Sequence, residues 1–178
     1  MSIIAIEGSN CSGKSTLIDY LVKYYNVKTS KSVPEWFRPY IPFARELQPQ
    51  LQRKIYEIGH IAAYYDALKE KSCTIFDRCY FSTYIRLSYQ ESKTVNECVD
   101  QIASFHYKPD LIIILTVPKE IIEQRLVERN KQFNQDFFEY ENSVYLPLSF
   151  KYDNIILVDN SKDIKFCTNE ILRKIKRR

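Results

Sequence analysis

The 178-residue chain lacks several features that would place it in other classes of protein. It contains no apolar run long enough to span a bilayer, and the apolar stretch near its start is too short for a signal peptide. Its five cysteines form no Cys-x-x-Cys pair and no cluster with histidine, and their odd number argues against a closed disulfide framework. These absences predict a cytoplasmic protein in a reducing environment, with no membrane partner.

A large excess of one charge is also missing. The chain has 26 basic and 22 acidic residues, a net charge of +4, whereas a nucleic-acid-binding domain usually carries a denser basic face. We see no internal repeat and no low-complexity linker, and the 45% hydrophobic content is too high for a disordered chain. We therefore expect one domain over residues 1–178, with no nucleic acid as partner.

The most specific motif is residues 8–15, which read Gly-Ser-Asn-Cys-Ser-Gly-Lys-Ser between an apolar run and a helical pattern. Glycines allow the backbone to turn tightly there, and successive N–H groups then point inward at the start of a helix. This arrangement is a P-loop, a cage for a polyphosphate. Lys14 would reach the β and γ oxygens, and Ser15 would offer its hydroxyl to Mg²⁺. The residues expected to bind the nucleotide in this segment are Gly8, Ser12, Gly13, Lys14, Ser15 and Thr16.

A second constellation, Asp77-Arg78 followed by Ser82, stands where an apolar run beginning near Cys73 ends. Strand carboxyl ends line the ligand crevice of open α/β sheets. Asp77 there could hold Mg²⁺ through water, and Arg78 could form a bidentate contact with a phosphate. The alternative is that Asp77 only forms an ion pair with another cation at the end of the strand.

Short apolar runs alternate with helical patterns along the whole chain. The strand candidates are residues 3–6, 73–76, 111–115 and 155–158, with a weaker one at 27–33. Alternation of this kind implies parallel pairing through right-handed crossovers, and continuous apolar strands imply cover on both faces. The prediction is an α/β fold, a three-layer sandwich around a five-stranded parallel sheet.

Four helices are predicted between these strands. Residues 15–25 follow the P-loop, and residues 48–71 place apolar side chains at the helical period. A capping-box signature at residues 94–97 opens a helix that ends before Pro109. Residues 118–131 open with proline in the first turn. The expected buried face of this last helix consists of Ile121, Ile122, Leu126 and Val127.

A P-loop alone does not name a reaction. A GTPase would normally read guanine with Asn-Lys-x-Asp after a strand, and the candidate at residues 130–133 lacks the aspartate and follows a helix. Four segments together resemble the thymidylate kinase and deoxynucleoside kinase group of P-loop kinases. They are the opening through Leu17 with its Glu-Gly pair, Asp77-Arg78 with Ser82, residues 109–129 with Arg125 and Arg129, and residues 145–159. The resemblance implies an ATP- and Mg²⁺-dependent kinase of a small-molecule nucleoside or nucleotide.

The resemblance also implies roles for matching positions. Arg78 would hold the acceptor or transferred phosphate, and Asp77 would organise Mg²⁺. Arg125 and Arg129, in a short lid around residues 125–137, would close over the γ-phosphate, exclude water and lower the barrier with mobile cations. The alternative for these two arginines is a solvated helix face paired with Glu123 or Glu128.

The two kinase families differ in their acceptor. A 5′-hydroxyl benefits from a general base, whereas the phosphate of a nucleotide is already ionised and mainly needs cations. Glu35 is the candidate base or acceptor contact, and the alternative is a loop carboxylate paired with Arg38. Thymidylate kinases tend to place an arginine in the long helix at the register of Tyr56, but Arg53 lies one turn earlier.

The favoured reaction is the thymidylate-kinase-like one, in which dTMP and ATP give dTDP and ADP. The alternatives are a deoxynucleoside kinase that phosphorylates a 5′-hydroxyl and a nucleotide-binding sensor without catalysis. Catalysis is assigned to Lys14, Arg78, Arg125 and Glu35. Acceptor binding, through aromatic stacking and an amide that reads the base edge, is assigned to Glu35, Trp36, Gln52, Tyr56 and Arg78. A homodimer is expected because related kinases often pair through helices.

Overall fold

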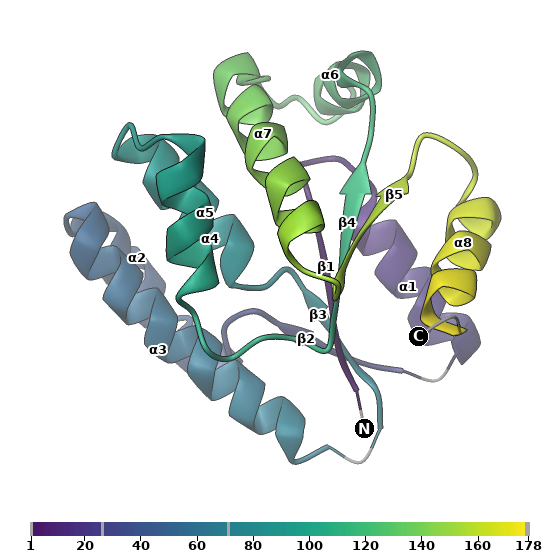
Figure 1. Cartoon of the computed structure of the whole chain (residues 1–178), viewed down its shortest axis with the longest axis horizontal. Coiled ribbons are helices and arrows are strands. Elements are labelled where there is room, and N and C mark those ends of the chain that lie inside the picture. Colours follow the sequence, from purple (N-terminus) through teal and green to yellow (C-terminus); the bar gives the residue numbers. More distant parts are fainter. Residues whose placement is uncertain (1, 26, 71, 177–178) are drawn as a thin grey trace.

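Five parallel strands form the centre of the structure, a computed structural model that describes residues 2–25, 27–70 and 72–176 (Figure 1). Their order across the sheet is β2-β3-β1-β4-β5, and each neighbouring pair is parallel. The strands are β1 (Ile3–Gly8), β2 (Lys28–Lys31), β3 (Thr74–Asp77), β4 (Leu111–Thr116) and β5 (Ile155–Asp159). The five strands predicted from the sequence, including the weak candidate at residues 27–33, are confirmed.

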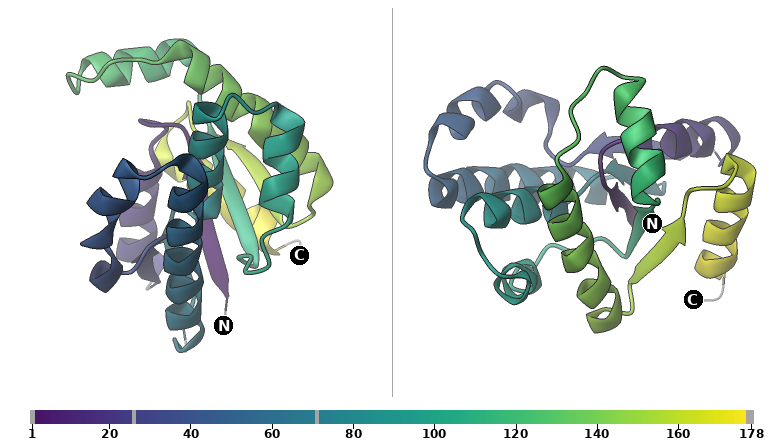
Figure 2. Two further views of the ribbon diagram at one scale, coloured as in Figure 1. Left: turned by 90° about the vertical axis from the view of Figure 1, so that its left-hand side faces the viewer. Right: turned by 90° about the horizontal axis from the view of Figure 1, so that it is seen from above.

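Helices cover both faces of this sheet, so the three-layer prediction is also confirmed (Figures 1 and 2). One face carries α1 (Lys14–Tyr25) and α8 (Ile164–Lys176). The other face carries α3 (Pro49–Leu68), α4 (Tyr80–Gln90), α5 (Val95–Ala103) and α7 (Gln135–Lys151). A 3₁₀ turn (Glu35–Phe37) and α2 (Tyr40–Glu46) connect β2 to α3, and α6 (Lys119–Val127) lies beyond the carboxyl end of β4.

Strand β4 shows why the sheet must be covered on both sides. Ile112 and Ile114 pack in the core under α3, α4, α5 and α7, whereas Ile113 and Leu115 pack in the core under α1 and α8. All four side chains are almost completely buried. A strand that is apolar on both faces needs helices on both faces, which is the usual state of a parallel sheet.

Helix α3 is present as predicted, but of the apolar positions at the helical period only Ile55 packs against a core cluster. Leu51, Ile58 and Tyr65 are exposed, whereas the buried side of the helix carries Gly59, Ala63 and other residues one position away. A Cβ at position 59 would lie 3.0 Å from Val33 and 3.2 Å from Phe37. Gly59 therefore lets the helix lie close to its neighbours, while Leu51, Ile58 and Tyr65 stay exposed.

The other helices confirm some sequence expectations and correct those for the ends and the buried face of α6. Thr94 and Glu97 form the reciprocal capping box before α5. Helix α6 ends at Val127 rather than at residue 131, and Pro118 is its N-cap residue rather than its first helical residue. Ile122 and Leu126 are buried, but Val127 is exposed, so its predicted place in the buried face was wrong.

Two further expectations concern cysteines and membranes. All five cysteines are free in the structure. Among the described residues, we find no helix that combines the length and the apolar character needed to cross a bilayer.

The topology fixes where a ligand can bind. The chain leaves β1 and crosses to β2 and β3 on one side, then passes to β4 and β5 on the other side. The point at which the direction of winding reverses therefore lies at the carboxyl end of β1, where the P-loop begins. Ligands of open α/β sheets bind in this crevice.

Candidate active site

The P-loop depends on its two glycines for its shape. Gly8 and Gly13 have φ angles of 132° and 93°, a region that other residues rarely adopt. A Cβ on Gly8 would lie 2.5 Å from the carbonyl oxygen of Leu115, and a Cβ on Gly13 would collide with the side-chain amide of Asn160. Cys11, with φ 63°, adopts the left-handed region without being glycine. The two glycines adopt these angles without strain, so within the loop only Cys11 has an unfavourable backbone conformation.

Lys14 is folded back over this loop. Only 7% of the residue is exposed, and Nζ donates hydrogen bonds to the carbonyl oxygens of Gly8 (2.8 Å) and Ser9 (2.7 Å). Burial, with a smaller contribution from the nearby Arg78, lowers the pKa of Lys14 from 10.5 to about 8. The ammonium group is therefore held at the mouth of the anion cage by contacts that phosphate oxygens can replace.

The lowered pKa of Lys14 leads to a prediction about pH. If this side chain must be charged to bind a polyphosphate, the second-order rate constant kcat/KM for ATP falls above pH about 8, by roughly tenfold per pH unit. At saturating ATP the bound phosphates stabilise the ammonium group, so kcat itself falls only at higher pH. Steady-state kinetics over a pH series test this, and a kcat/KM that stays flat for more than one pH unit above that value contradicts it.

Arg78 connects the end of β3 to the P-loop. Its Nη1 donates to Ser82 Oγ (2.6 Å) and its Nη2 donates to Asn10 Oδ1 (3.0 Å), while Glu7 Oε2 lies 3.7 Å from Nη1. Burial alone would lower the pKa of Arg78, but the charge of Glu7 and of other nearby acidic groups raises it above its ordinary value. The guanidinium group is therefore a fixed cation that faces the anion cage.

Glu7 is a buried carboxylate that the sequence reasoning did not assign to the site. Its Oε1 accepts a hydrogen bond from the backbone N–H of Cys79 (2.7 Å), and its Oε2 accepts one from the hydroxyl of Ser82 (2.5 Å). Ser82 in turn accepts from Arg78. The available signal was an acidic residue inside an apolar strand, because a carboxylate in such a position must be paired.

Glu141 is a second buried carboxylate next to the P-loop, and it was also missed. It lies on α7, accepts a hydrogen bond from the hydroxyl of Tyr145 (3.2 Å) and contacts Ser9. Burial raises its pKa, although Ser9, Arg78 and Lys14 oppose the effect. Helical periodicity gave no sign of this role, because Ser9, Arg78 and Lys14, which oppose the effect of burial, come from segments far away in the sequence.

Three of the cavities near the P-loop contain residues predicted for the site. The first, here called the Arg78 cavity, has a volume of about 480 Å³. Four cationic side chains line it: Lys31, Arg38, Arg45 and Arg78. Tyr56, Thr83 and Asp77 belong to the same wall, so the structure places three sequence-predicted residues, Tyr56, Asp77 and Arg78, around one opening. Arg38 and Arg45 come from the α2 region, which the sequence reasoning did not resolve.

His60 supports two sides of this cavity. Its ring is completely buried, and burial lowers its pKa to about 4, so the imidazole is neutral. Nδ1 must donate to the carbonyl oxygen of Ser32 (2.7 Å), which leaves Nε2 to accept from the hydroxyl of Thr83 (3.1 Å). Ser32 and Thr83 both line the Arg78 cavity. His60 therefore braces two segments of the cavity wall.

The second cavity, here called the Arg125 cavity, lies on the other flank of the P-loop and has a volume of about 260 Å³. Its lining includes the predicted nucleotide-binding residues Gly13, Thr16 and Arg129 together with Arg125. Arg125 Nη1 donates to the carbonyl oxygen of Cys11 (3.1 Å), so α6 is attached to the P-loop. The geometry suits the polyphosphate-binding role expected of both arginines.

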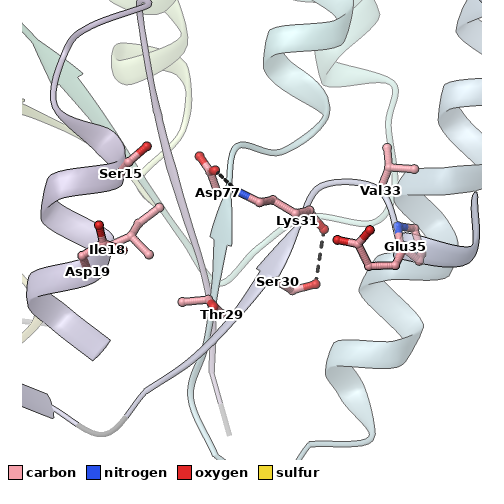
Figure 3. Close-up of a pocket in the computed structure, with 10 residues that line it drawn as sticks. Ser15, Ile18, Asp19, Thr29, Ser30, Lys31, Val33, Glu35 and Asp77 are labelled. Carbon is pink, nitrogen blue, oxygen red and sulfur yellow. Dashed lines mark hydrogen bonds and ion pairs between the residues drawn. The ribbon is translucent and has the colours of Figure 1, made fainter. Parts of the chain in front are cut away.

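The third cavity, here called the Ser15 cavity, has a volume of about 380 Å³ and lies between α1 and the ends of β2 and β3 (Figure 3). Ser15 and Asp77, the two predicted Mg²⁺ ligands, both point into it. Asp77 forms an ion pair with Lys31, which is the alternative foreseen for this carboxylate. Among the described residues, no group of three or more acidic, histidine or cysteine side chains has the geometry of a metal site. A hydroxyl and a carboxylate nevertheless suit Mg²⁺, which usually binds one or two protein oxygens together with substrate phosphates and water.

Three predicted acceptor residues lie elsewhere. Glu35 is exposed over 77% of its side chain, pairs with Arg38 (3.0 Å) and lines the Ser15 cavity, not the Arg78 cavity. Trp36 is exposed and packs edge-on against Phe37. Gln52 is buried, and its Nε2 donates to the carbonyl oxygen of Leu47 (2.7 Å), so it stabilises the turn before α3.

Comparison with known proteins gives results consistent with this geometry. The sequence model of the family described as thymidylate kinase matches residues 6–171. A protein of Saccharolobus solfataricus named probable thymidylate kinase 1 is 30% identical, and the match covers 97% of this chain and 93% of that protein.

Similar solved structures include a thymidylate kinase from Candida albicans, with a TM-score of 0.71 at 20% identity, covering 99% of this chain and 91% of that chain. A deoxyadenosine kinase from M. mycoides has a TM-score of 0.64 at 21% identity, covering 98% of each chain. Because these two proteins are only 20% and 21% identical to this chain, the structural similarity supports the assignment of the fold alone.

Proposed function

Because the chain belongs to the thymidylate kinase family, we propose that it transfers the γ-phosphoryl group of ATP to the 5′-phosphate of dTMP and releases dTDP and ADP. The observation that supports this acceptor within the chain itself is the Arg78 cavity, with Lys31, Arg38, Arg45 and Arg78 in its wall. Cations of this number suit the phosphate of a nucleotide, whereas a neutral 5′-hydroxyl needs a general base. Glu35, the candidate base, lies in the Ser15 cavity and pairs with Arg38.

ATP binds with its β- and γ-phosphates in the P-loop. The backbone N–H groups at the start of α1 and the ammonium group of Lys14 contact the phosphate oxygens, and Lys14 gives up its bonds to Gly8 and Ser9 as it does so. Arg125 and Arg129 approach from the Arg125 cavity and add positive charge on the outer flank. Ser15 and Asp77 would hold Mg²⁺, which would supply positive charge to neutralise the phosphate oxygens.

Arg78 lies between the two substrates. One side of the guanidinium contacts Asn10 of the P-loop, and the side chain also lines the Arg78 cavity where dTMP binds. Glu7 and Ser82 hold it in place, so no reorganisation is needed as negative charge develops on the transferred group. Catalysis in this scheme consists of positioning and charge stabilisation, as is usual in phosphoryl transfer.

We also assign the whole chain to one kinase domain with a lid at residues 125–137. This segment contains the end of α6, the connecting loop and the first turn of α7. The loop carries Arg129, and Arg125 is bonded to the P-loop. Closure of the segment would exclude water from the transferred phosphoryl group. A homodimer and a cytoplasmic location stay predictions from the sequence.

An acceptor panel tests the proposed reaction. ADP release is measured with ATP, Mg²⁺ and either dTMP, other deoxynucleoside monophosphates, thymidine or deoxycytidine. We expect turnover with dTMP and at least about a hundredfold lower kcat/KM with thymidine, because only the nucleotide engages the cations of the Arg78 cavity. Turnover that is faster with thymidine contradicts the proposal, and nucleotide binding without turnover of any acceptor favours a sensor.

Two variants sharpen this test. Arg45→Ala removes a cation of the Arg78 cavity, and we expect it to raise the KM for dTMP about tenfold with little change in the KM for ATP. Glu35→Gln is the matched test of the general base, because it keeps the size of the side chain. A nucleotide kinase retains its kcat in Glu35→Gln, whereas a nucleoside kinase that uses this base loses at least about a hundredfold.

A further inference from the structure

We infer that Lys31 is a substrate-positioning residue that exchanges Asp77 for the acceptor's phosphate when Asp77 takes up Mg²⁺. The inference rests on the proposed function, since it concerns the same two substrates. It adds a residue that the sequence reasoning did not single out. It also predicts that binding at the Ser15 cavity and binding at the Arg78 cavity are coupled.

The pairing of the sheet places Lys31 and Asp77 next to each other. Lys31 is the last residue of β2, Asp77 is the last residue of β3, and the two are register partners in parallel strands. Their side chains form an ion pair at the carboxyl edge of the sheet (Figure 3). The candidate metal ligand Asp77 therefore carries a monovalent cation supplied by the chain itself.

The pair stands in the wall between two cavities. Lys31, Val33 and Asp77 line both the Ser15 cavity and the Arg78 cavity. Ser15 belongs only to the first of these, and Arg78 only to the second. The ammonium group of Lys31 thus has a carboxylate on one side and a cavity rich in arginine on the other. A dianionic phosphate in the Arg78 cavity would give it a second binding partner.

The ion pair has the properties of a contact that is easily exchanged. Lys31 is exposed over 53% of its side chain and Asp77 over 21%, and ion pairs of this exposure contribute little net stability. Lysine carries its charge on a flexible stem with three rotatable donors, so it can be redirected without movement of the backbone. A divalent ion bound to Asp77 and to phosphate oxygens interacts with the carboxylate more strongly than one ammonium group does.

The exchange makes binding cooperative. With nucleotide but without Mg²⁺, Lys31 stays on Asp77 and the acceptor's phosphate meets one cation fewer. With Mg²⁺, Lys31 is released and joins the arginines of the Arg78 cavity. Because coupling between two sites is reciprocal, dTMP must then also tighten the binding of Mg²⁺. The alternative is a fixed pair that only ties the edge strand β2 to β3.

Lys28 provides a matched control within the same strand. It begins β2, forms an ion pair with Glu70, and is exposed to a similar degree, 59% of its side chain. Lys28→Met therefore removes the same group from a comparable ion pair at the amino end of β2, away from the P-loop. Lys31→Arg is the conservative variant, which keeps the charge and is expected to keep the coupling.

The experiment measures dTMP affinity by calorimetry in the presence of the non-hydrolysable analogue AMP-PNP, with either Mg²⁺ or EDTA. We expect Mg²⁺ to tighten dTMP binding about fivefold in the wild type, in Lys28→Met and in Lys31→Arg, and to have no effect in Lys31→Met. The inference is overturned if Lys31→Met keeps the full Mg²⁺ effect. This includes the case in which Lys31→Met weakens dTMP binding by the same factor with Mg²⁺ and with EDTA, because Lys31 would then be a fixed contact.

A titration of Mg²⁺ without any acceptor separates this inference from the proposed function. With AMP-PNP bound, we expect Lys31→Met to bind Mg²⁺ about threefold to fivefold more tightly than the wild type, and Lys28→Met to match the wild type. A wild-type protein that binds no dTMP would contradict the proposed function. The exchange would then be judged by this titration alone, and an unchanged Mg²⁺ affinity in Lys31→Met would overturn it.

Discussion

Replacement of Lys14 by methionine is expected to lower kcat for dTMP phosphorylation by at least about a thousandfold, because the variant cannot stabilise charge on the transferred phosphoryl group. Methionine has nearly the same length and volume as lysine, so the P-loop keeps a filled interior. The effect is measured by ADP release at saturating substrates. Lys54→Met, at an exposed ion pair with Glu57 on α3, is the control and should retain full activity.

The same substitution should leave the fold intact. Burial lowers the pKa of Lys14 to about 8, so the charged form is less favourable in the folded chain by about 3 kcal/mol than in water. Methionine removes this cost but leaves the carbonyl oxygens of Gly8 and Ser9 without their donor. The two effects oppose each other, and we expect the free energy of unfolding to change by no more than about 1 kcal/mol.

The pH dependence of stability gives an independent check on Lys14. Because its folded-state pKa is about 8 and its unfolded value is near 10.5, the unfolded chain binds more protons between these two pH values. The contribution of Lys14 to the free energy of unfolding therefore rises with pH across that window, and it is absent from Lys14→Met. Urea unfolding of the wild type and of Lys14→Met at a series of pH values measures the difference.

For the kinetic prediction, a kcat of Lys14→Met within tenfold of the wild type would contradict the catalytic role of Lys14.

The sequence predicted the parts of the site that are local in the chain. The P-loop and the Asp77-Arg78 pair each lie directly after an apolar strand, and strand ends meet at one edge of a parallel sheet. The sheet could be predicted for the same reason, because short apolar runs between helical patterns have few other solutions. The contact between Arg78 and Asn10 follows from that topology.

The features of the site and of α3 that could not be predicted depend on how side chains pack in the folded chain. Gln52 and Trp36 have side chains suited to base recognition, but Gln52 is buried against the turn before α3 and Trp36 is exposed. The buried face of α3 could not be predicted from Leu51, Ile58 and Tyr65, which are exposed, because Gly59 lies close to neighbouring side chains instead. Arg38 and Arg45 were not assigned to the site because neither lies near a strand end, and only the path of α2 brings them to the Arg78 cavity.

Replacement of Arg78 by lysine is expected to lower kcat/KM for dTMP by about a hundredfold to a thousandfold, although the charge is kept. The guanidinium group contacts Ser82 and Asn10 through two different nitrogen atoms, and it lies 3.7 Å from Glu7. A single ammonium nitrogen does not reproduce the planar fork whose separate nitrogens reach Ser82 and Asn10. The φ angle of 70° at this position is unfavourable for lysine and arginine alike, so the backbone gives no reason for a difference.

The control for this prediction is Arg53→Lys. Arg53 also pairs with a carboxylate, with its Nη2 2.7 Å from Glu91 Oε2, but it ties α3 to the end of α4. We expect Arg53→Lys to keep kcat/KM for dTMP within about threefold of the wild type, since Arg53 joins two helices and does not line the Arg78 cavity. A loss of equal size in the two variants would mean that the Arg78 effect is structural.

A double-mutant cycle with Glu7 tests why Arg78 is held so firmly. Glu7→Gln keeps an acceptor for the backbone N–H of Cys79 but removes the negative charge beside Arg78. If Glu7 acts by orienting the guanidinium group, Glu7→Gln lowers kcat/KM for dTMP in the wild-type background but has little further effect in Arg78→Lys. The two losses would be additive if Glu7 only stabilised the fold. Strong non-additivity would show that β1 positions the cation between the two substrates, so the strand that opens into the P-loop would also set the geometry of the acceptor side.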